Sequence, residues 1–309
     1  MAKVLITGGD GKLGRVVNRY LSAEHNVTIF DLNNNQETNQ TNSGDVMNRP
    51  DLRQALRGNN ILVHLAAIDA DVSATDEDFM RVNVMGTWNV FEEATIANIS
   101  KIIFFSSVAV YGIGVGTPPN YLPIDEQHPL SPKSSYSLSK LLGENIAKRF
   151  ASTSNVKVIC FRAPYIIHEA GALAIHEHSQ NIDKIKLSGT LPPAYSNIPP
   201  LEGARSYVFA EDVAKAISLG IADDVITWEV FNVSAPDTYS TQLTLNLIND
   251  EYGQSDHVES QQDGRNYGCA SMFTSDKMEK KLNWKPTQKW KTAVAKIEQN
   301  HHPVDYCLK

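Results

Sequence analysis

The sequence has few cysteines and no long apolar run. Its 309 residues include only three cysteines, and Cys160, Cys269 and Cys307 lack the spacing of a metal site or a disulfide framework. No stretch approaches the length of a membrane span, and the first apolar run is too short for the core of a signal peptide. We therefore expect a cytoplasmic protein with free cysteines and no membrane segment.

The sequence also lacks an excess of basic residues. It has 28 Lys and Arg against 35 Asp and Glu, which gives a formal net charge of -7. An acidic chain is poorly suited to bind nucleic acid or an anionic membrane surface, so neither is an expected partner. A hydrophobic content of 42% with 20% charged residues is ordinary for a globular protein, and the length suffices for two domains.

A glycine-rich turn follows the first apolar run. Residues 3–7 are mostly branched and apolar, which predicts a buried parallel strand. The next residues are Gly8-Gly9-Asp10-Gly11-Lys12-Leu13-Gly14, and apolar residues at helical spacing come after them. A strand-to-helix turn of this kind lets the backbone approach a pyrophosphate at the helix N-terminus. It predicts a dinucleotide site, with a glycine turn that binds no ligand as the alternative.

The next predicted strand, residues 27–30, ends in Asp31. A carboxylate at this place accepts hydrogen bonds from the adenosine ribose and repels a 2′-phosphate. No Lys or Arg lies between Leu32 and Met47 to neutralise such a phosphate. The predicted cofactor is therefore NAD and not NADP.

Tyr136 and Lys140 are the residues expected to carry proton chemistry. They follow two prolines in a stretch with helical spacing, and stand about one turn apart on one helix face. An ammonium near a phenol favours the phenolate, so we expect Lys140 to lower the pKa of Tyr136. On spacing alone, an exposed tyrosine beside a solvated lysine is the commoner arrangement.

Further apolar runs alternate with helical patterns along the chain. Residues 61–67, 101–107 and 156–161 are predicted strands, and the alternation favours an α/β fold with a doubly wound parallel sheet. Ser107 falls at the carboxyl end of a strand, where open parallel sheets place their chemistry. His64 lies inside an apolar run, which is more typical of a hydrogen-bonded core residue than of a catalyst.

Together these motifs resemble the extended short-chain dehydrogenase/reductases, also called the NAD-dependent epimerase/dehydratase family. The resemblance rests on the glycine turn, His64-Leu65-Ala66-Ala67, residues 83–90, Ser106 to Gly112, Tyr136-x-x-x-Lys140, residues 205–214, Phe231-Asn232-Val233 and residues 276–286. It implies a Rossmann sheet with a smaller C-terminal α/β substrate domain. The NAD-binding domain would comprise residues 1–165 plus 205–232, and the substrate domain residues 166–204 plus 233–309.

The resemblance implies a role for each matching residue. Tyr136 would be the acid/base, Lys140 would hold the nicotinamide ribose, and Ser107 would bind the reacting oxygen. Substrate would be contacted by Ser107, Tyr165 and Arg205, although a structural ion pair of Arg205 with Glu202 or Asp212 is an equal alternative. NAD would be contacted by Gly8, Gly11, Lys12, Leu13, Asp31, Asp45, Val46, Leu65, Ala66, Ala67, Tyr136, Lys140 and Pro164.

Two departures from the family narrow the reaction. Dehydratases of the family carry an Asp-Glu pair after the serine, where this chain has Val108 and Ala109. Neither side chain can transfer a proton, so dehydration is disfavoured. Nucleotide-sugar epimerases carry an asparagine near the position of Tyr165, and its replacement weakens the nucleotide-sugar interpretation.

The sequence therefore predicts an NAD-dependent epimerase or oxidoreductase acting on a sugar or nucleotide-sugar. The expected assembly is a homodimer formed through the Tyr136 helix and a helix over residues 79–97. A free-sugar or alcohol dehydrogenase with exchangeable NAD and a non-catalytic NAD-binding regulator are the alternatives. No metal is expected, because His176-Glu177-His178 lacks the spacing of ligands on one helix face.

Overall fold

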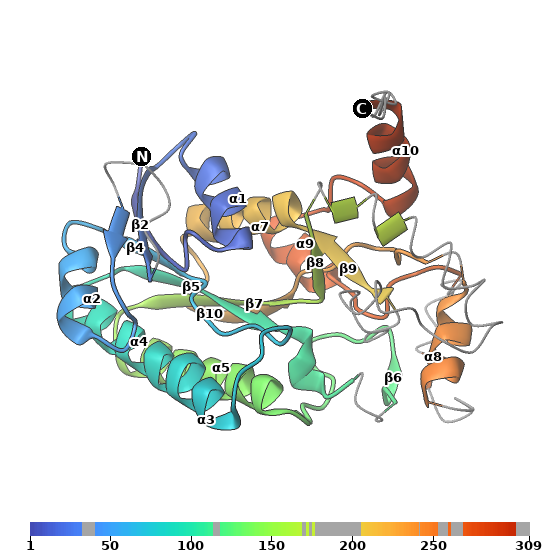
Figure 1. Cartoon of the computed structure of the whole chain (residues 1–309), viewed down its shortest axis with the longest axis horizontal. Coiled ribbons are helices and arrows are strands. Elements are labelled where there is room, and N and C mark those ends of the chain that lie inside the picture. Colours follow the sequence, from blue (N-terminus) through green and yellow to red (C-terminus); the bar gives the residue numbers. More distant parts are fainter. Residues whose placement is uncertain are drawn as a thin grey trace, which may run out of the picture.

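A single parallel sheet forms the centre of the molecule. The computed structural model describes residues 1–32, 41–113, 118–168, 171–172, 175–176, 205–240, 242–252, 259–260 and 268–300. Within them, seven strands pair in the order β10-β7-β5-β4-β1-β2-β3 (Figure 1). They are β1 (Lys3–Thr7), β2 (Asn26–Asp31), β3 (Thr41–Ser43), β4 (Ile61–His64), β5 (Lys101–Ser107), β7 (Lys157–Ala163) and β10 (Trp228–Asn232). The strand order reverses beside β1, which confirms the predicted doubly wound fold.

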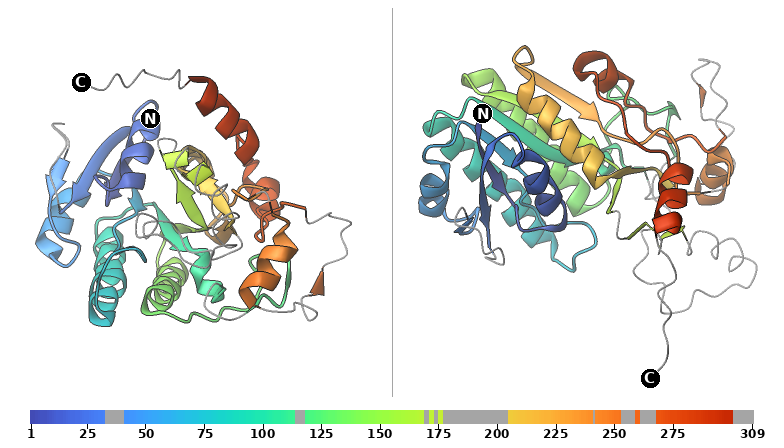
Figure 2. Two further views of the ribbon diagram at one scale, coloured as in Figure 1. Left: turned by 45° about the vertical axis from the view of Figure 1, so that its right-hand side comes forward. Right: turned by 90° about the horizontal axis from the view of Figure 1, so that it is seen from above.

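Helices cover both faces of this sheet. One face carries α1 (Lys12–Leu21) and α7 (Ala210–Ala222), which lie side by side (Figure 2). The other face carries α2 (Arg49–Leu56), α4 (Thr87–Ile96) and α5 (Ser135–Thr153) (Figure 1). The strands are thus buried on both sides, which explains why their sequences are continuous apolar runs and do not alternate.

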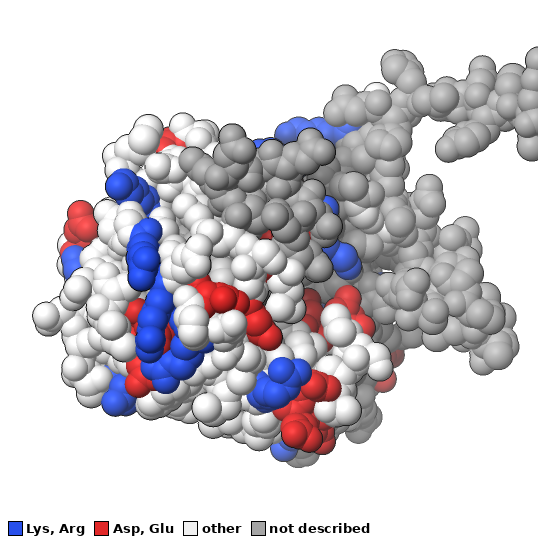
Figure 3. Space-filling model, turned by 60° about the vertical axis from the view of Figure 1, so that its left-hand side comes forward, with Lys and Arg blue, Asp and Glu red and all other residues white. Residues whose placement is uncertain are grey.

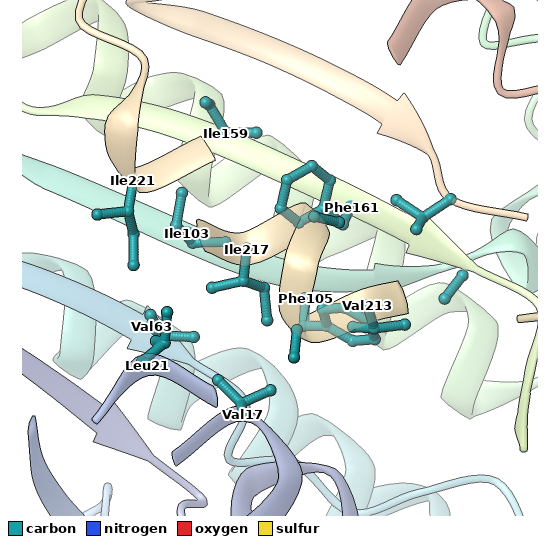
Figure 4. Close-up of a cluster of buried hydrophobic side chains, with 14 of the residues drawn as sticks. Val17, Leu21, Val63, Ile103, Phe105, Ile159, Phe161, Val213, Ile217 and Ile221 are labelled. Atoms are coloured by element: carbon teal, nitrogen blue, oxygen red, sulfur yellow. The ribbon is translucent and has the colours of Figure 1, made fainter. Parts of the chain in front are cut away.

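The core divides into two layers because successive strand side chains point to opposite faces. In β5, Ile103 and Phe105 pack with the α1 and α7 residues Val17 and Ile217, as Figure 4 shows. Phe104 instead packs toward α4 and α5. Full burial of each such side chain contributes about 1.5–3 kcal/mol.

Smaller elements lie beyond the carboxyl ends of the strands. They include two short parallel sheets, β8 (Tyr165–Ile167) with β9 (Tyr207–Phe209) and β6 (Tyr121–Leu122) with β11 (Glu259–Ser260). The helices α8 (Thr244–Tyr252) and α10 (Trp290–Asn300) belong to this part of the chain, whereas α9 (Asp276–Leu282) packs against the edge strand β10 (Figure 1). Trp290 stacks on Phe209 and so anchors α10 to β9. The division into an NAD-binding and a substrate domain stays a prediction.

The helix predicted over residues 79–97 contains a π-helical segment. The structure has α3 (Asp76–Asp78), a π-helical segment, Phe79–Gly86, and then α4. The wider turn coincides with Asn83, whose side chain bonds the backbone of Ile68. Hydrophobic spacing cannot distinguish a π-helical turn from an α-helical one, so the sequence did not predict this turn type.

Acidic and basic side chains adjoin on the surface around α2. Arg49 bonds both Glu92 and Glu93, and Arg53 bonds Glu93. Figure 3 brings this side of the molecule forward and shows blue and red side chains in contact. Hydrogen bonding to Arg53 lowers the pKa of the Glu93 carboxyl despite its burial. In the described ranges, none of the helices combines the length and the apolar character needed to cross a bilayer.

Candidate active site

The glycine turn packs closely against the end of β4. Gly8 has a φ of 73°, and a Cβ there would lie 2.7 Å from the backbone nitrogen of Ala66. A Cβ on Gly14 would lie 2.2 Å from the carbonyl oxygen of Gly8. Only glycine fits at these positions, so the turn is held against the strand ends where a dinucleotide would run.

The N-terminus of α1 suits an anionic ligand. Gly11 is the residue that caps this helix, and it has no side chain to bond the first-turn N–H groups. Lys12 is exposed in the first turn and adds a positive charge. The arrangement fits a pyrophosphate, and the contacts predicted for Gly11, Lys12 and Leu13 stay predictions.

Asp31 lies at the end of β2 beside the glycine turn. Its Oδ2 accepts a hydrogen bond from the backbone N–H of Asp10 at 3.0 Å. This bond orients the carboxylate at the position that the sequence predicts for ribose recognition. Asp45 and Val46 follow β3, and Val46 packs on Gly86, where a Cβ would approach it to 2.8 Å.

His64 is a core residue, as the sequence indicates. Its Nδ1 and Nε2 pair with the hydroxyls of Thr7 at 2.7 Å and Thr87 at 3.0 Å. Burial, with a smaller effect of the Lys140 charge, lowers the pKa of His64 to about 3. The imidazole is therefore neutral and links β1, β4 and α4.

Ser107 ends β5 and begins a short 3-10 turn. Its Oγ accepts a hydrogen bond from the backbone N–H of Ala109 at 3.1 Å. The turn ends at Gly112, whose φ is 75° and whose Cβ, if present, would lie 1.8 Å from the carbonyl oxygen of Ser131. The Ser131 N–H also donates to the Val110 carbonyl at 3.0 Å, so the segment before α5 packs against this turn.

Tyr136 and Lys140 lie on α5, as predicted. The helix begins with a capping box in which the side chains of Ser134 and Ser137 each bond the other's backbone. Lys140 is buried, and its Nζ lies 5.6 Å from the centre of the Tyr136 ring and donates to the carbonyl oxygen of Phe105 at 3.1 Å. Burial lowers the pKa of Lys140 to about 8.

Ser107 and Asp69 act on the Tyr136 phenol in opposite directions. The Ser107 hydroxyl lowers the pKa of the phenol, whereas the Asp69 carboxylate raises it. Burial raises the pKa more than either group changes it.

The predicted lowering of the Tyr136 pKa is wrong. The sequence predicts that Lys140 lowers the pKa, whereas burial and then the Asp69 charge raise it. The Lys140 ammonium is bonded to the Phe105 carbonyl. The phenol therefore carries its proton.

Asp69 is the site residue that sequence reasoning missed. It lies in the loop after β4, next to the predicted cofactor contacts Leu65, Ala66 and Ala67. The available signal was its position, because a polar residue just beyond the carboxyl end of a central parallel strand is placed for chemistry.

The substrate residues predicted after β7 lie at different depths. Tyr165 is 42% exposed at the start of β8, and the charges of Asp71 and Asp69 reach it. Pro164 is buried just before it. Arg205 is 1% exposed, has a φ of 58° and donates from Nη1 to the Ser240 hydroxyl at 3.0 Å. Its substrate role stays a prediction, and Glu202 lies outside the described residues.

No metal site is found within the described ranges. His176 belongs to them, but Glu177 and His178 do not. Among the described residues, no group of three or more His, Cys, Asp or Glu side chains is placed to hold an ion. Cys160 is buried and Cys269 is partly exposed, both as free thiols, and Cys307 lies outside the described residues.

The part of the chain that holds this site matches a known protein family. Residues 4–234 match the model of the NAD dependent epimerase/dehydratase family. The chain belongs to this family. The family resemblance predicted from the motifs is therefore confirmed, and so is NAD as the cofactor.

Known relatives of this chain include an epimerase and a dehydrogenase. A Methanocaldococcus jannaschii protein provisionally named UDP-glucose 4-epimerase is 27% identical over 95% of this chain and 96% of its own length. The L-arabinose 1-dehydrogenase (NAD(P)(+)) of Haloferax volcanii is 32% identical over 54% of this chain and 68% of its own. Among solved structures, an Agrobacterium tumefaciens short-chain dehydrogenase/reductase superfamily protein with bound NAD has a TM-score of 0.73 at 20% identity, covering 96% of both chains. That likeness shows the fold.

Proposed function

We propose that the protein is an NAD-dependent epimerase or oxidoreductase that acts on a sugar or nucleotide-sugar, with Tyr136 as the acid/base. The observation that carries this proposal is the position of Lys140, whose Nζ lies 5.6 Å from the centre of the Tyr136 ring and donates to the Phe105 carbonyl, two residues before Ser107. Ser107 ends β5, which is in the same sheet as β1, the strand that the glycine turn follows, and Tyr136 and Lys140 are on α5. Membership of the family supports the assignment.

Ser107, Tyr136 and Lys140 each have a separate role in the transfer of one proton. When bound, NAD supplies the hydride acceptor or donor. Ser107 donates a hydrogen bond to the reacting oxygen, and Tyr136 gives that oxygen a proton when a carbonyl is reduced. In the oxidising direction Tyr136 must first lose the proton that burial and the Asp69 charge favour. It can then take the proton of the substrate hydroxyl, and the nearby Lys140 charge opposes the effect of Asp69 on that phenolate.

The residues after Ser107 restrict the reaction. Val108 and Ala109 begin the 3-10 turn, and their side chains carry no group that exchanges a proton. Elimination of water would need both an acid and a base beside the sugar. We therefore propose epimerisation or simple oxidation and reduction, not dehydration.

A free-sugar dehydrogenase is the second candidate. The observation that favours it is the half-exposed Tyr165, which stands where a nucleotide-sugar epimerase of the family has an asparagine. The similarity to an L-arabinose 1-dehydrogenase agrees with it. A non-catalytic regulator is less well supported, because it would have no need of Ser107, Tyr136 and Lys140 together.

A cytoplasmic homodimer is also proposed. Met85 and Leu138 are 51% and 40% exposed on the two helical segments predicted to pair. Association through these segments would bury them. Light scattering at micromolar concentration should give the mass of a dimer, and the mass of a single chain would contradict the proposal.

Two measurements test the proposed function. Freshly purified protein is denatured and its supernatant assayed for NAD and NADH, since an epimerase retains its cofactor whereas a dehydrogenase exchanges it at each turnover. Sugars and nucleotide-sugars are then screened, and Tyr136→Phe should abolish turnover but keep NAD binding. Tyr20→Phe, at an exposed tyrosine of α1, is the control. Full activity of Tyr136→Phe would overturn the assignment.

A further inference from the structure

We propose that Ser139 is a positioning residue, which together with Asn83 fixes the turn of α5 that carries Tyr136 relative to the glycine turn. This inference rests on the proposed function, since it takes Tyr136 to be the acid/base. It assigns a role to a row of buried polar side chains that take no direct part in the reaction.

The row begins beside the glycine turn. Thr7 is fully buried directly before Gly8, and its hydroxyl lies 2.7 Å from Nδ1 of His64. The His64 Nε2 lies 3.0 Å from the Thr87 hydroxyl, which donates to the backbone carbonyl of Asn83 at 2.6 Å. Because a carbonyl only accepts and the imidazole is neutral, Thr87 accepts from Nε2–H of His64 and Thr7 donates to Nδ1. The proton positions in this half of the row are thereby assigned.

The Asn83 side chain continues the row to the acid/base. Its Oδ1 accepts from the Ile68 N–H at 2.7 Å, and its Nδ2 donates to the Ile68 carbonyl at 3.0 Å and to the Ser139 hydroxyl at 3.1 Å. Ser139 is fully buried, and it donates its own hydroxyl proton to the backbone carbonyl of Tyr136 at 2.7 Å. The bonds of the row thus donate in one direction, from the glycine turn toward Tyr136.

Two further contacts hold the same part of α5. The Ser135 hydroxyl donates to Oδ1 of Asp76 at 2.6 Å, which ties the first turn of α5 to α3. The ring of Phe79 packs edge-on against that of Tyr136, with the ring centres 6.0 Å apart. The bond to Ser139 differs from that of Ser135 because it is buried, where water does not compete for the donor. It therefore restrains this turn most strictly.

Ser152 offers a comparison on the same helix. Its hydroxyl also donates to the carbonyl three residues earlier, that of Arg149, at 2.8 Å, but Ser152 is exposed. Such a bond is common for serine in helices and positions nothing by itself. Ser139 differs in its burial and in the second bond, from Asn83. A buried network of this kind is rigid when its members are paired, and this rigidity is what a proton-transfer site requires.

Ser139→Ala and Ser152→Ala test the positioning role. Alanine removes the hydroxyl at both places and favours the helix, so both variants should fold. We expect Ser139→Ala to lower kcat about tenfold at an unchanged KM for the sugar, because misplaced reacting groups slow the chemical step and not binding. Ser152→Ala should leave both constants unchanged. Equal kcat in the two variants would overturn the inference.

The far end of the row gives a second test. Thr7→Val keeps the shape of the side chain but removes the donor to His64. Three other members of the row separate Thr7 from Ser139, so independent losses in kcat would multiply in the variant that combines Thr7→Val with Ser139→Ala. If the row acts as a unit, that variant should have about the kcat of Ser139→Ala alone at saturating NAD. Losses that multiply would contradict the row.

Hydrogen exchange separates this inference from the proposed function, because it needs no substrate. Thr7→Val and Ser139→Ala should each accelerate exchange of the N–H groups of residues 138–142 at least about threefold. Thr28→Val, on the adjacent strand β2 and only half-buried, is the control and should not. If no sugar is turned over, the proposed function fails and exchange still decides the inference. Exchange in α5 that neither Thr7→Val nor Ser139→Ala changes would overturn it.

Discussion

Arg162 and Glu144 form a bidentate ion pair below the ends of β5 and β7. The Arg162 Nε lies 2.8 Å from Oε1 of Glu144, and Nη2 lies 2.6 Å from Oε2. The side chains are 5% and 6% exposed. Ser106 donates to the same Oε1 at 2.6 Å, so the pair joins the helix of Tyr136 to the strand of Ser107.

Glu144→Gln should destabilise the protein strongly. The change leaves the buried Arg162 guanidinium without its counter-charge, which costs about 3–5 kcal/mol. Urea unfolding measures the free energy of unfolding. Glu279→Gln breaks a surface pair with Lys285, exposed 47% and 64%, and should cost less than about 1 kcal/mol. Equal losses in the two variants would contradict the prediction.

Replacing both partners should be tolerated better than replacing one. In the double variant Glu144→Leu/Arg162→Met no charge is left buried, so its loss should be smaller than that of Glu144→Gln. The Ser106 hydroxyl still loses its acceptor. The double variant should also lose turnover, by more than its loss of folded protein explains. The reason is that the ion pair positions Ser107 relative to Tyr136. A double variant less stable than the single one would argue against a charge effect.

His64 should make the protein acid-sensitive. Its folded pKa, about 3, lies below the unfolded value near 6.5, so above pH 6.5 both states are neutral. Below it only the unfolded state binds a proton, and stability falls by about 1.4 kcal/mol per pH unit until pH approaches 3. Between pH 7.5 and 5.0, His64→Asn should lose about 2 kcal/mol less than the unmodified protein. A variant with the same acid dependence would refute this.

Asp31→Asn should weaken the preference for NAD over NADP. The substitution keeps the side-chain size and an oxygen for the Asp10 N–H, but removes the charge that repels a 2′-phosphate. A charge effect of roughly 1.4 kcal/mol changes the ratio of dissociation constants tenfold. Fluorescence titration with NADH and NADPH measures that ratio. Asp51→Asn, in the first turn of α2, is the control, and an unchanged ratio in Asp31→Asn would exclude the role.

Lys101→Met should loosen the end of α7. The Lys101 ammonium is buried and donates to the carbonyls of Gly220 at 3.1 Å and Ile221 at 2.8 Å, and to that of Asp223. Methionine keeps the apolar stem but leaves these carbonyls unpaired, at about 1–3 kcal/mol for each one that stays buried. Hydrogen exchange should show faster exchange in the last turn of α7 than in α1. Unchanged protection would contradict the prediction.

The sequence predicted those features that local pattern determines. The glycine turn, Asp31 after its strand, and the spacing of Tyr136 and Lys140 are all properties of a few consecutive residues. Asp69 and the raised pKa of Tyr136 were not predicted, because they depend on a loop after β4 meeting a helix much later in the chain. The role of Asn83 was not predicted for the same reason, because its partners Ile68 and Ser139 are far from it in the sequence.

The π-helical segment Phe79–Gly86 also sets how the residues after it are rotated about the helix axis relative to the residues before it. A π-helical turn contains one residue more than an α-helical turn, and so rotates all later residues by about 100°. With this rotation Asn83 faces Ile68 while Phe91 still points into the core. Deleting a single residue here would turn one of the two away from its partner. The segment should therefore accept substitutions at its exposed Met85 far more readily than any change in its length.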